Sequence, residues 1–213
     1  MASFLDNIPT VTRNLLFVNV IMFVATLINE PFMVQTFAMF YPASPFFRWW
    51  QPLTHMFMHG GWWHIFFNMY SLVMFGMVVE RVLGTRKFLL FYFVTGLGAV
   101  ALHTGVEWLE ITYLGGNLQQ SLLTPMVGAS GAIFGVLVAF AMLYPEARMT
   151  LLFPPVTLNA KWMVIIFILI ELVTGIRGSS LGIAHFAHLG GALFGWIMIT
   201  LWRKTGKIYK RYY

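Results

Sequence analysis

Four side chains of types suited to acyl transfer lie in apolar stretches of this sequence. They are Ser130, within Gly128-Ala129-Ser130-Gly131, together with His188, His64 and Asn68. A serine hydroxyl becomes a nucleophile when a base takes its proton, and neutral imidazole accepts protons in the physiological range. His64 and Asn68 are four residues apart, so on a helix they share one face and could donate hydrogen bonds to an oxyanion. The residue types therefore point to serine–histidine chemistry.

Ser130 opens a short apolar run, and this run determines where the hydroxyl would lie. The run from Ala129 to Tyr144 has 16 residues, and a helix from Ser130 to Tyr144 rises roughly 22 Å at about 1.5 Å per residue. The hydrocarbon core of a bilayer is roughly 30 Å thick. With Tyr144 at one membrane face, Ser130 begins its helix below the other face, where its backbone N–H needs a partner. The dipole of a helix favours an oxyanion at such a start.

The composition identifies a membrane protein. Of the 213 residues, 59% are hydrophobic and 9% are charged, whereas a soluble domain carries about a quarter charged residues. The net charge of +6 comes from basic residues at the ends of apolar runs, which is a topology signal, so no nucleic acid is expected as a partner. The absence of cysteine excludes disulfides, thiolate catalysis and cysteine metal sites. No cleavable signal peptide is expected.

The apolar pattern predicts an all-α, polytopic membrane protein in which residues 1–213 form one domain. Six spans are expected, followed by a basic tail at 203–213: residues 13–29, 62–79, 88–107, 129–144, 162–175 and 185–202. A long first loop at 30–61 combines four prolines with many Phe and Trp residues, which suits the membrane interface. Residues 109–127 are expected to form a polar loop.

Basic residues are distributed unevenly between the two sides of this predicted bundle. Eleven lie in the amino terminus, the 80–87 and 145–161 loops and the tail, whereas only Arg48 and Arg177 lie on the opposite side. The positive-inside rule therefore places both termini in the cytoplasm.

Counting from the cytoplasmic ends brings the candidate residues to one depth. Ser130 and His188 each lie 14 residues from those ends and His64 lies 15, so all three are roughly 21 to 23 Å deep, with Asn68 about 6 Å lower. Glu171 counts to about 15 Å, near the bilayer midplane. No carboxylate is expected at the depth of the histidines, which predicts a Ser–His dyad rather than a triad. Glu171 is predicted to be structural, facing the protein interior and hydrogen-bonded or protonated.

Glycines indicate that the fourth and sixth spans approach closely. Gly131 and Gly135 are four residues apart on the fourth span, as are Gly191 and Gly195 on the sixth. Small residues at this spacing let two helix backbones meet in lipid. His188 shares its face with Gly191 and Gly195, so this contact would bring it within reach of Ser130.

These residues resemble the rhomboid family of intramembrane serine proteases. The resemblance covers residues 30 to 202 and is carried by three motifs: Gly128-Ala129-Ser130-Gly131; Ala187-His188-Leu189-Gly190-Gly191 with Gly195; and His55-x3-His59-x4-His64-x3-Asn68. It implies a six-helix bundle with Ser130 as the nucleophile and His188 as the general base. It also implies an oxyanion hole formed by His64, Asn68 and the Ser130 amide.

The resemblance further implies partners and a location. The expected substrates are transmembrane segments, usually of single-pass proteins in the lipid bilayer, that are cut near the membrane surface after a small residue. From the residues themselves, no cofactor and no metal are expected. The expected location is a bacterial inner membrane. Two positions depart from some bacterial members of the family: Phe134 stands in place of an aromatic hydroxyl that stacks on the histidine, and Trp50-Gln51 stands in place of a Trp-Arg pair. Stacking by Phe134 is still expected.

Other interpretations of the same residues are also open. Ser130 could be a small packing residue. His185 could pair with His188 as metal ligands, and together with His55, His59 and His64 this makes a zinc site conceivable. We favour structural roles for His55 and His59, which would bond first-loop backbone, and an interfacial position for His103.

The alternative functions are a catalytically silent rhomboid-like protein that binds membrane clients in quality control, and, less favoured, a small transporter. The first loop and residues 176–184 are candidates for lateral entry and lid motion. The oligomeric state is not predicted.

Overall fold

The computed structural model describes residues 4–151, 155–177 and 185–208, and these residues are mostly helical. The all-α fold class is therefore confirmed, with one small hairpin, β1 (Arg148–Thr150) and β2 (Thr157–Asn159), in which Met149 pairs with Leu158. The longer helices are α1 (Thr10–Ile28), α4 (Trp62–Ser71) continued by α5 (Met77–Leu83), α6 (Thr85–Tyr113), α8 (Ser130–Leu143), α9 (Ala160–Arg177) and α10 (His185–Lys204). The shorter ones are 3-10 turns at Phe4–Asn7 and His55–Phe57, α2 (Glu30–Phe37), α3 (Gln51–Thr54) and α7 (Leu118–Leu123).

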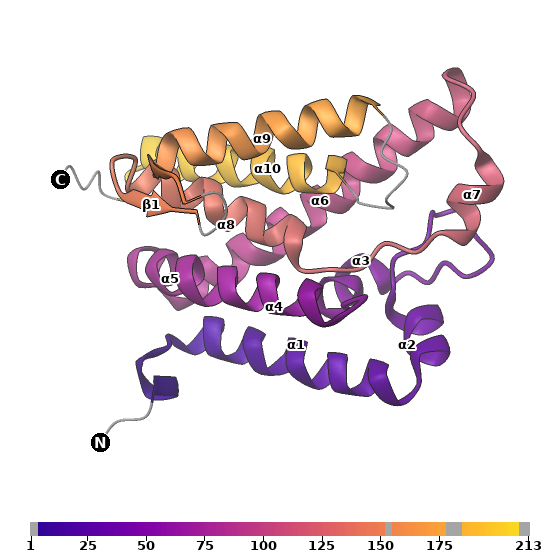
Figure 1. Ribbon diagram of the computed structural model, residues 1–213, viewed down its shortest axis with the longest axis horizontal. Helices are drawn as coiled ribbons and strands as arrows, with labels where there is room; N and C mark the ends of the chain where they lie inside the picture. The colour runs from indigo at the N-terminus through magenta and orange to yellow at the C-terminus, as the bar shows by residue number, and fades with distance from the viewer. Residues whose placement is uncertain (1–3, 152–154, 178–184, 209–213) are drawn as a thin grey trace.

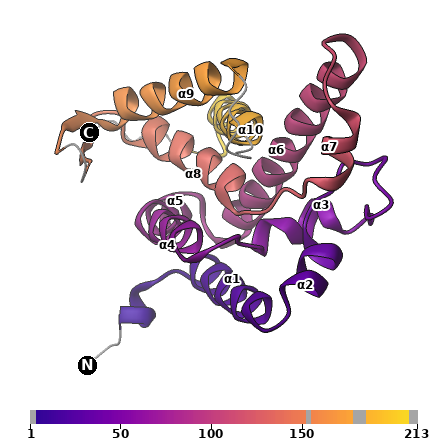
Figure 2. The same cartoon turned by 45° about the vertical axis from the view of Figure 1, so that its right-hand side comes forward.

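The long helices form a bundle in which successive helices reverse direction (Figure 1). α1 lies on one side and α9 on the other, and α1 begins at the same end of the bundle at which α10 ends. The turned view shows α10 nearly end-on, enclosed by α6, α8 and α9 (Figure 2). α8 is thus the innermost helix, with most of its side chains buried, whereas α10 packs against its neighbours on one side and keeps Leu193, Trp196 and Leu201 exposed on the other.

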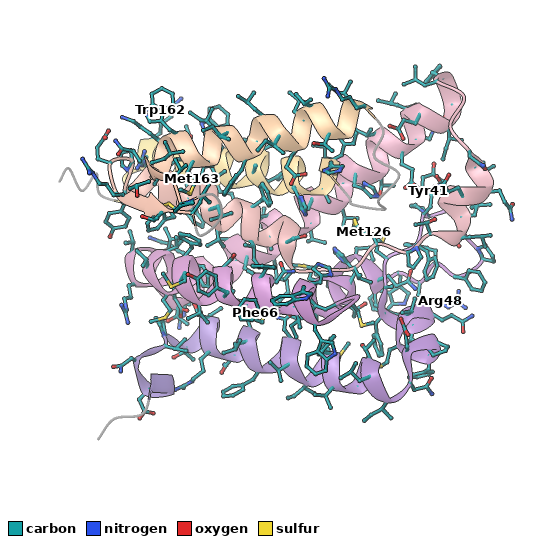
Figure 3. The ribbon with its side chains drawn as sticks, in the orientation of Figure 1. Tyr41, Arg48, Phe66, Met126, Trp162 and Met163 are labelled. Carbon is teal, nitrogen blue, oxygen red and sulfur yellow. The ribbon has the colours of Figure 1, made fainter. Side chains whose placement is uncertain are left out.

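Apolar side chains cover the outside as well as the core of this bundle. The largest fully buried side chains include Phe88, Phe91 and Tyr92 of α6, whereas Ile21 of α1 is 65% exposed. On α9, Trp162 projects away from the bundle and the neighbouring Met163 is directed into it (Figure 3). Exposed apolar helix faces of this kind are stable in lipid rather than in water. The chain is an integral membrane protein.

Three helical segments of the described chain are long and apolar enough to cross a membrane, namely Thr10–Ile28, Trp62–Leu83 and Thr85–Tyr113. α8 is apolar but shorter, and α9 and α10 carry charged residues within or close to their apolar stretches. The count of six spans therefore stays a prediction.

Element bounds differ most from expectation in the third predicted span and the loop after it. α6 is 29 residues long and extends through Tyr113, and α7 occupies Leu118–Leu123, so much of the expected loop at 109–127 is helical. The second span contains a π-helical turn at Leu72–Gly76. Asn117 caps α7 by accepting the Gln120 N–H, a local signal that hydropathy does not register.

Glu80 joins the start of α1 to α5 through buried hydrogen bonds. Its Oε1 accepts the Val11 N–H at 2.9 Å, and its Oε2 accepts the N–H and the hydroxyl of Thr12 at 2.7 and 2.8 Å. Amide groups in a first helical turn have no partner inside their own helix, and negative charge is favourable there. The carboxylate therefore anchors the first helix against the second span.

Gln51 organises the long first loop around its buried side chain. Its Oε1 accepts the N–H groups of Phe40 and Arg48, and its Nε2 donates to the carbonyls of Gln35 and Phe46. A glutamine amide has donors and acceptors for all of these backbone groups. This residue thus holds together a loop that has little regular structure.

Candidate active site

The start of α8 is held in place by backbone hydrogen bonds to the first loop. Met126 and Met39 exchange two backbone hydrogen bonds of 2.8 and 2.9 Å, and the Gly128 N–H donates to the His55 carbonyl at 3.0 Å. Gly128 has a φ of +130°, and a Cβ at this position would lie 2.8 Å from His64 Nε2. Only glycine fits this turn. The turn directs the chain into α8 with Ser130 as its first residue.

Glycines place α8 and α10 in backbone contact. A Cβ on Gly191 would lie 1.8 Å from the Gly131 carbonyl oxygen, and one on Gly195 would lie 2.8 Å from the Gly135 Cα. The two glycine pairs expected to face each other therefore do so. Because the backbones meet here, His188, one turn before Gly191, lies beside Ser130.

His188 Nε2 lies 2.8 Å from Ser130 Oγ. The imidazole ring stacks on Phe134, one turn after the serine, with ring centroids 4.5 Å apart and an interplanar angle of 4°. The expected stacking by Phe134 is therefore present. This stacking fixes the plane of the ring, so that Nε2 is presented to the hydroxyl.

His64 and Asn68 lie on α4 and border the same cavity as Ser130. His64 Nδ1 accepts the Gly60 N–H at 3.3 Å, so in the neutral ring the proton is on Nε2, which faces Gly128 and the serine. Asn68 Nδ2 donates to the His64 carbonyl at 2.9 Å, and an amide NH₂ carries a second donor. The structure thus brings both side chains to the site without occupying all of their donors.

The structure corrects the depth predicted for Glu171, which lies level with the histidines of the site. Its Oε2 is 2.6 Å from His185 Nδ1 and its Oε1 is 3.0 Å from His188 Nδ1. The prediction that no carboxylate accompanies the serine and histidine was therefore wrong. Counting residues gives the depth of a group along its own helix. It does not account for the tilt of α9 or for the offset of α9 along α10. Glu171 does face the protein interior and is hydrogen-bonded, as predicted.

A cavity of about 980 Å³ opens beside Ser130 and His188. Besides the site residues, it is lined by polar side chains of α6, α7 and the segment between them, including His103, Glu107, Glu110, Asn117 and Gln120. His103 therefore faces this cavity, while its predicted position at the membrane interface stays a prediction. The spacing of residues in the sequence does not predict that His103 faces the cavity, because the direction of its side chain depends on how α6 is rotated about its axis. The polar lining can hold water next to the serine.

His55 and His59 lie next to the site, in the buried part of the first loop. His55 Nδ1 contacts the Gln51 carbonyl at 3.1 Å, and the His59 ring packs edge-on against His64 with centroids 5.0 Å apart. Burial lowers the pKa of His55 to about 4 and the pKa of His59 to about 3. Both rings are therefore neutral at physiological pH. The contact with the Gln51 carbonyl supports the structural role predicted for His55, whereas among the described residues neither ring nitrogen of His59 has a hydrogen-bond partner, so the backbone bond predicted for His59 is absent there.

Two further sequence expectations concern a lid and a metal. Most of the candidate lid, residues 176–184, lies outside the described residues, as does the end of the basic tail at 209–213. Within the described part of the chain, no group of three or more His, Asp or Glu side chains is arranged to hold a metal ion.

The chain is similar to known proteins over most of its length. A family model described as the rhomboid domain matches residues 47–205. Rhomboid protease AarA of Providencia stuartii is 29% identical over 150 residues, which is 69% of this chain and 53% of that protein. The human mitochondrial presenilin-associated rhomboid-like protein is 34% identical over 149 residues, covering 70% of this chain and 36% of that protein.

A chloroplastic protein shares a longer stretch. Rhomboid-like protein 11 of Arabidopsis thaliana is 30% identical over 192 residues, which is 81% of this chain and 59% of that protein. The matched stretches thus cover between about a third and three fifths of these relatives. The matched family model includes the residues around His64, Ser130 and His188.

Proposed function

This chain belongs to the rhomboid family, and we propose that it is a serine-type intramembrane endopeptidase that cleaves transmembrane segments of membrane proteins. The observation that carries the proposal is the 2.8 Å separation of His188 Nε2 and Ser130 Oγ at the wall of a cavity that is lined by both polar and apolar side chains. A nucleophile and a base within hydrogen-bond distance, next to room for water and substrate, are what peptide hydrolysis requires. A relative named a rhomboid protease supports the same activity.

In the proposed reaction, Ser130 Oγ attacks the carbonyl carbon of the scissile peptide bond while His188 Nε2 takes the hydroxyl proton. The tetrahedral intermediate collapses when His188 returns this proton to the leaving amine, and an acyl-enzyme remains. A water molecule then attacks the ester carbonyl, with His188 again as base, which releases the new carboxylate and regenerates Ser130. The cavity lining at Asn117 and Gln120 supports delivery of this water.

The oxyanion of the intermediate is proposed to bind at three donors. The Ser130 N–H is at the first position of α8 and has no partner inside its helix. His64 Nε2 and the free hydrogen of Asn68 Nδ2 supply the other two. The α8 dipole adds positive potential at the same point.

We propose that both termini face the cytoplasm, on the basis of the charge distribution. The bacterial inner membrane stays a prediction, since the relatives include bacterial, mitochondrial and chloroplastic proteins.

The test is cleavage of a reporter transmembrane substrate by the purified protein in proteoliposomes. Ser130→Ala and His188→Ala are each expected to abolish cleavage, because one removes the nucleophile and the other the base, while the thermal unfolding midpoint stays near that of the wild type. A fluorophosphonate probe should label the wild type and not Ser130→Ala. Undiminished turnover in either variant would defeat the proposal, and a wild type that binds the reporter without cutting it would favour client binding.

A further inference from the structure

Glu171 is a carboxylate of α9 that contacts two histidines of α10. Its Oε2 accepts a hydrogen bond from His185 Nδ1 at 2.6 Å, and its Oε1 lies 3.0 Å from His188 Nδ1. The side chains of Glu171, His185 and His188 are 16%, 9% and 13% exposed. A carboxylate at this depth in a membrane protein is costly to keep, so its contacts indicate what it does.

The two ring nitrogens of His188 face different groups. Nε2 faces Ser130 Oγ, and Nδ1 is buried against Glu171. The two atoms are within hydrogen-bond distance, but their geometry is not that of a formed hydrogen bond. Hydrogen bonds of catalytic groups are often poorly aligned before substrate binds and tighten in the Michaelis complex.

This arrangement has a chemical consequence for the base. Nε2 can take the Ser130 proton only when the neutral ring carries its own proton on Nδ1. A carboxylate next to Nδ1 favours that tautomer and stabilises the imidazolium that forms in the transition state. Among the described residues, Glu171 is the one carboxylate in contact with His188.

We propose that Glu171 is a positioning residue for His188, so that the site is a Ser130–His188–Glu171 triad rather than a dyad. This inference rests on the proposed protease function. A purely structural carboxylate would be satisfied by its bond to His185, which ties α9 to α10. The second oxygen, Oε1, lies against Nδ1 of His188, the ring nitrogen that faces away from the serine. This contact assigns Glu171 a role in the reaction.

Other titratable groups surround His188 and bear on its behaviour with pH. His64 of α4 and His103 of α6 face it across the cavity, and Glu107 and Glu110 line that cavity further along α6. His185 lies one turn earlier on α10 and shares Glu171. These groups are unchanged in a Glu171 variant, so a difference in pH profile reports on the carboxylate itself.

The experiment measures kcat and KM for a reporter substrate in proteoliposomes as a function of pH. For Glu171→Gln, kcat is expected to fall by between about 10² and 10⁴-fold, the upper value being the loss found when an aligned triad carboxylate becomes an amide. KM should stay close to the wild-type value. The acidic limb of the kcat profile should move to lower pH, because protonated His188 has lost its anionic neighbour. Glu171→Asp, which keeps the charge, should recover part of the rate.

The matched control is Glu146→Gln, the same substitution at an exposed carboxylate that pairs with Lys161 far from the cavity. It should leave kcat and the pH profile unchanged. Wild-type kcat and an unmoved acidic limb in Glu171→Gln would overturn the triad, while an inactive Ser130→Ala in the same assay would leave the protease proposal standing. Full activity of Ser130→Ala would instead overturn the protease proposal.

A spectroscopic measurement keeps the test decisive if Glu171→Gln does not fold. In protein with ¹⁵N-labelled histidine, the ring shifts report the environment of each ring nitrogen, and His188→Gln identifies the His188 signals. A base needs its proton on Nδ1 with or without a carboxylate, so the triad is tested by the change in the His188 Nδ1 signal when the carboxylate is moved. This signal should shift in Glu171→Asp and stay at its wild-type position in Glu146→Gln, and an unshifted His188 Nδ1 signal in Glu171→Asp would overturn the triad.

Discussion

At the scale of single residues, the site depends on which atoms are left free to bind an oxyanion. His64 uses Nδ1 to accept the Gly60 N–H, and Asn68 uses one amide hydrogen within its own helix. Each residue keeps one donor for the cavity. These are local consequences of the helix start at Trp62 and of the i, i+4 spacing.

His64→Ala and Asn68→Ala should each lower kcat by about 10² to 10³-fold, the usual cost of one lost oxyanion donor. Both variants should retain more activity than Ser130→Ala, because two donors remain. Kinetics on the reporter substrate provide the measurement. Tyr70→Phe is the control, since Tyr70 is on the same segment and 48% exposed. Wild-type rates in both alanine variants would contradict the oxyanion assignment.

The buried histidines of the first loop predict how stability depends on pH. Burial holds the pKa of His55 at about 4, below its ordinary value of 6.5. The unfolded chain therefore binds more protons than the folded one as pH falls from about 6.5 to about 4, and stability falls over that range. His55 alone contributes roughly 3 kcal/mol at most. His59, whose pKa is lowered further, adds to the effect.

The measurement is the thermal unfolding midpoint in detergent, followed by tryptophan fluorescence between pH 7.5 and pH 4. The wild-type midpoint should fall across this range, and His55→Gln should show a smaller fall, since it lacks one of the titrating groups. A midpoint that rises or stays level as pH falls would show that these rings are not buried in their neutral form.

At the scale of elements, the contact between α8 and α10 decides whether the serine and the base meet. Gly191→Ala should force these helices apart, because its Cβ would lie 1.8 Å from a backbone oxygen that cannot turn away. We expect a lower unfolding midpoint, by the equivalent of about 1–3 kcal/mol or more, and a loss of cleavage.

Gly105→Ala is the matched control for this substitution. Gly105 lies on α6 with no atom within 4 Å of an added Cβ, so alanine there should be neutral or stabilise by about 0.5–1 kcal/mol. Unchanged stability and activity in Gly191→Ala would show that α8 and α10 are not in backbone contact.

At the scale of the whole molecule, the reversal of successive helices and the charge distribution predict one orientation. α6 carries the chain from the end of the bundle where α1 begins to the opposite end, where Leu114 is 77% exposed (Figure 1). Glu146 follows α8, which returns the chain. The loops on the Glu146 side hold most of the basic residues, so this side should face the cytoplasm.

The natural chain has no cysteine, so single cysteines report the orientation directly. An impermeant maleimide added to right-side-out vesicles should label Leu114→Cys at once, and Glu146→Cys and Lys207→Cys only after permeabilisation. The unsubstituted protein is the control and should remain unlabelled. Labelling of Leu114→Cys and Glu146→Cys from the same side would contradict this topology.

The sequence alone determined the properties that are local to one helix. Hydropathy and charge identify a helical membrane protein. The short run after Ser130 predicts a helix that starts inside the bilayer, and glycine spacing indicates which helix it meets. The expected span at 129–144 differs from α8, Ser130–Leu143, by one residue at each end. Such features are readable because each depends on residues within a few turns of one another.

Only the tertiary structure decided which groups on different helices lie together. It placed Glu171 against His188, His103 in the cavity and Glu80 at the start of α1. Counting residues gives the depth of a group along its own helix, but tilt, rotation and offset arise from side-chain packing between helices that are distant in sequence. For this reason the carboxylate beside the base could not be found by counting along α9 alone.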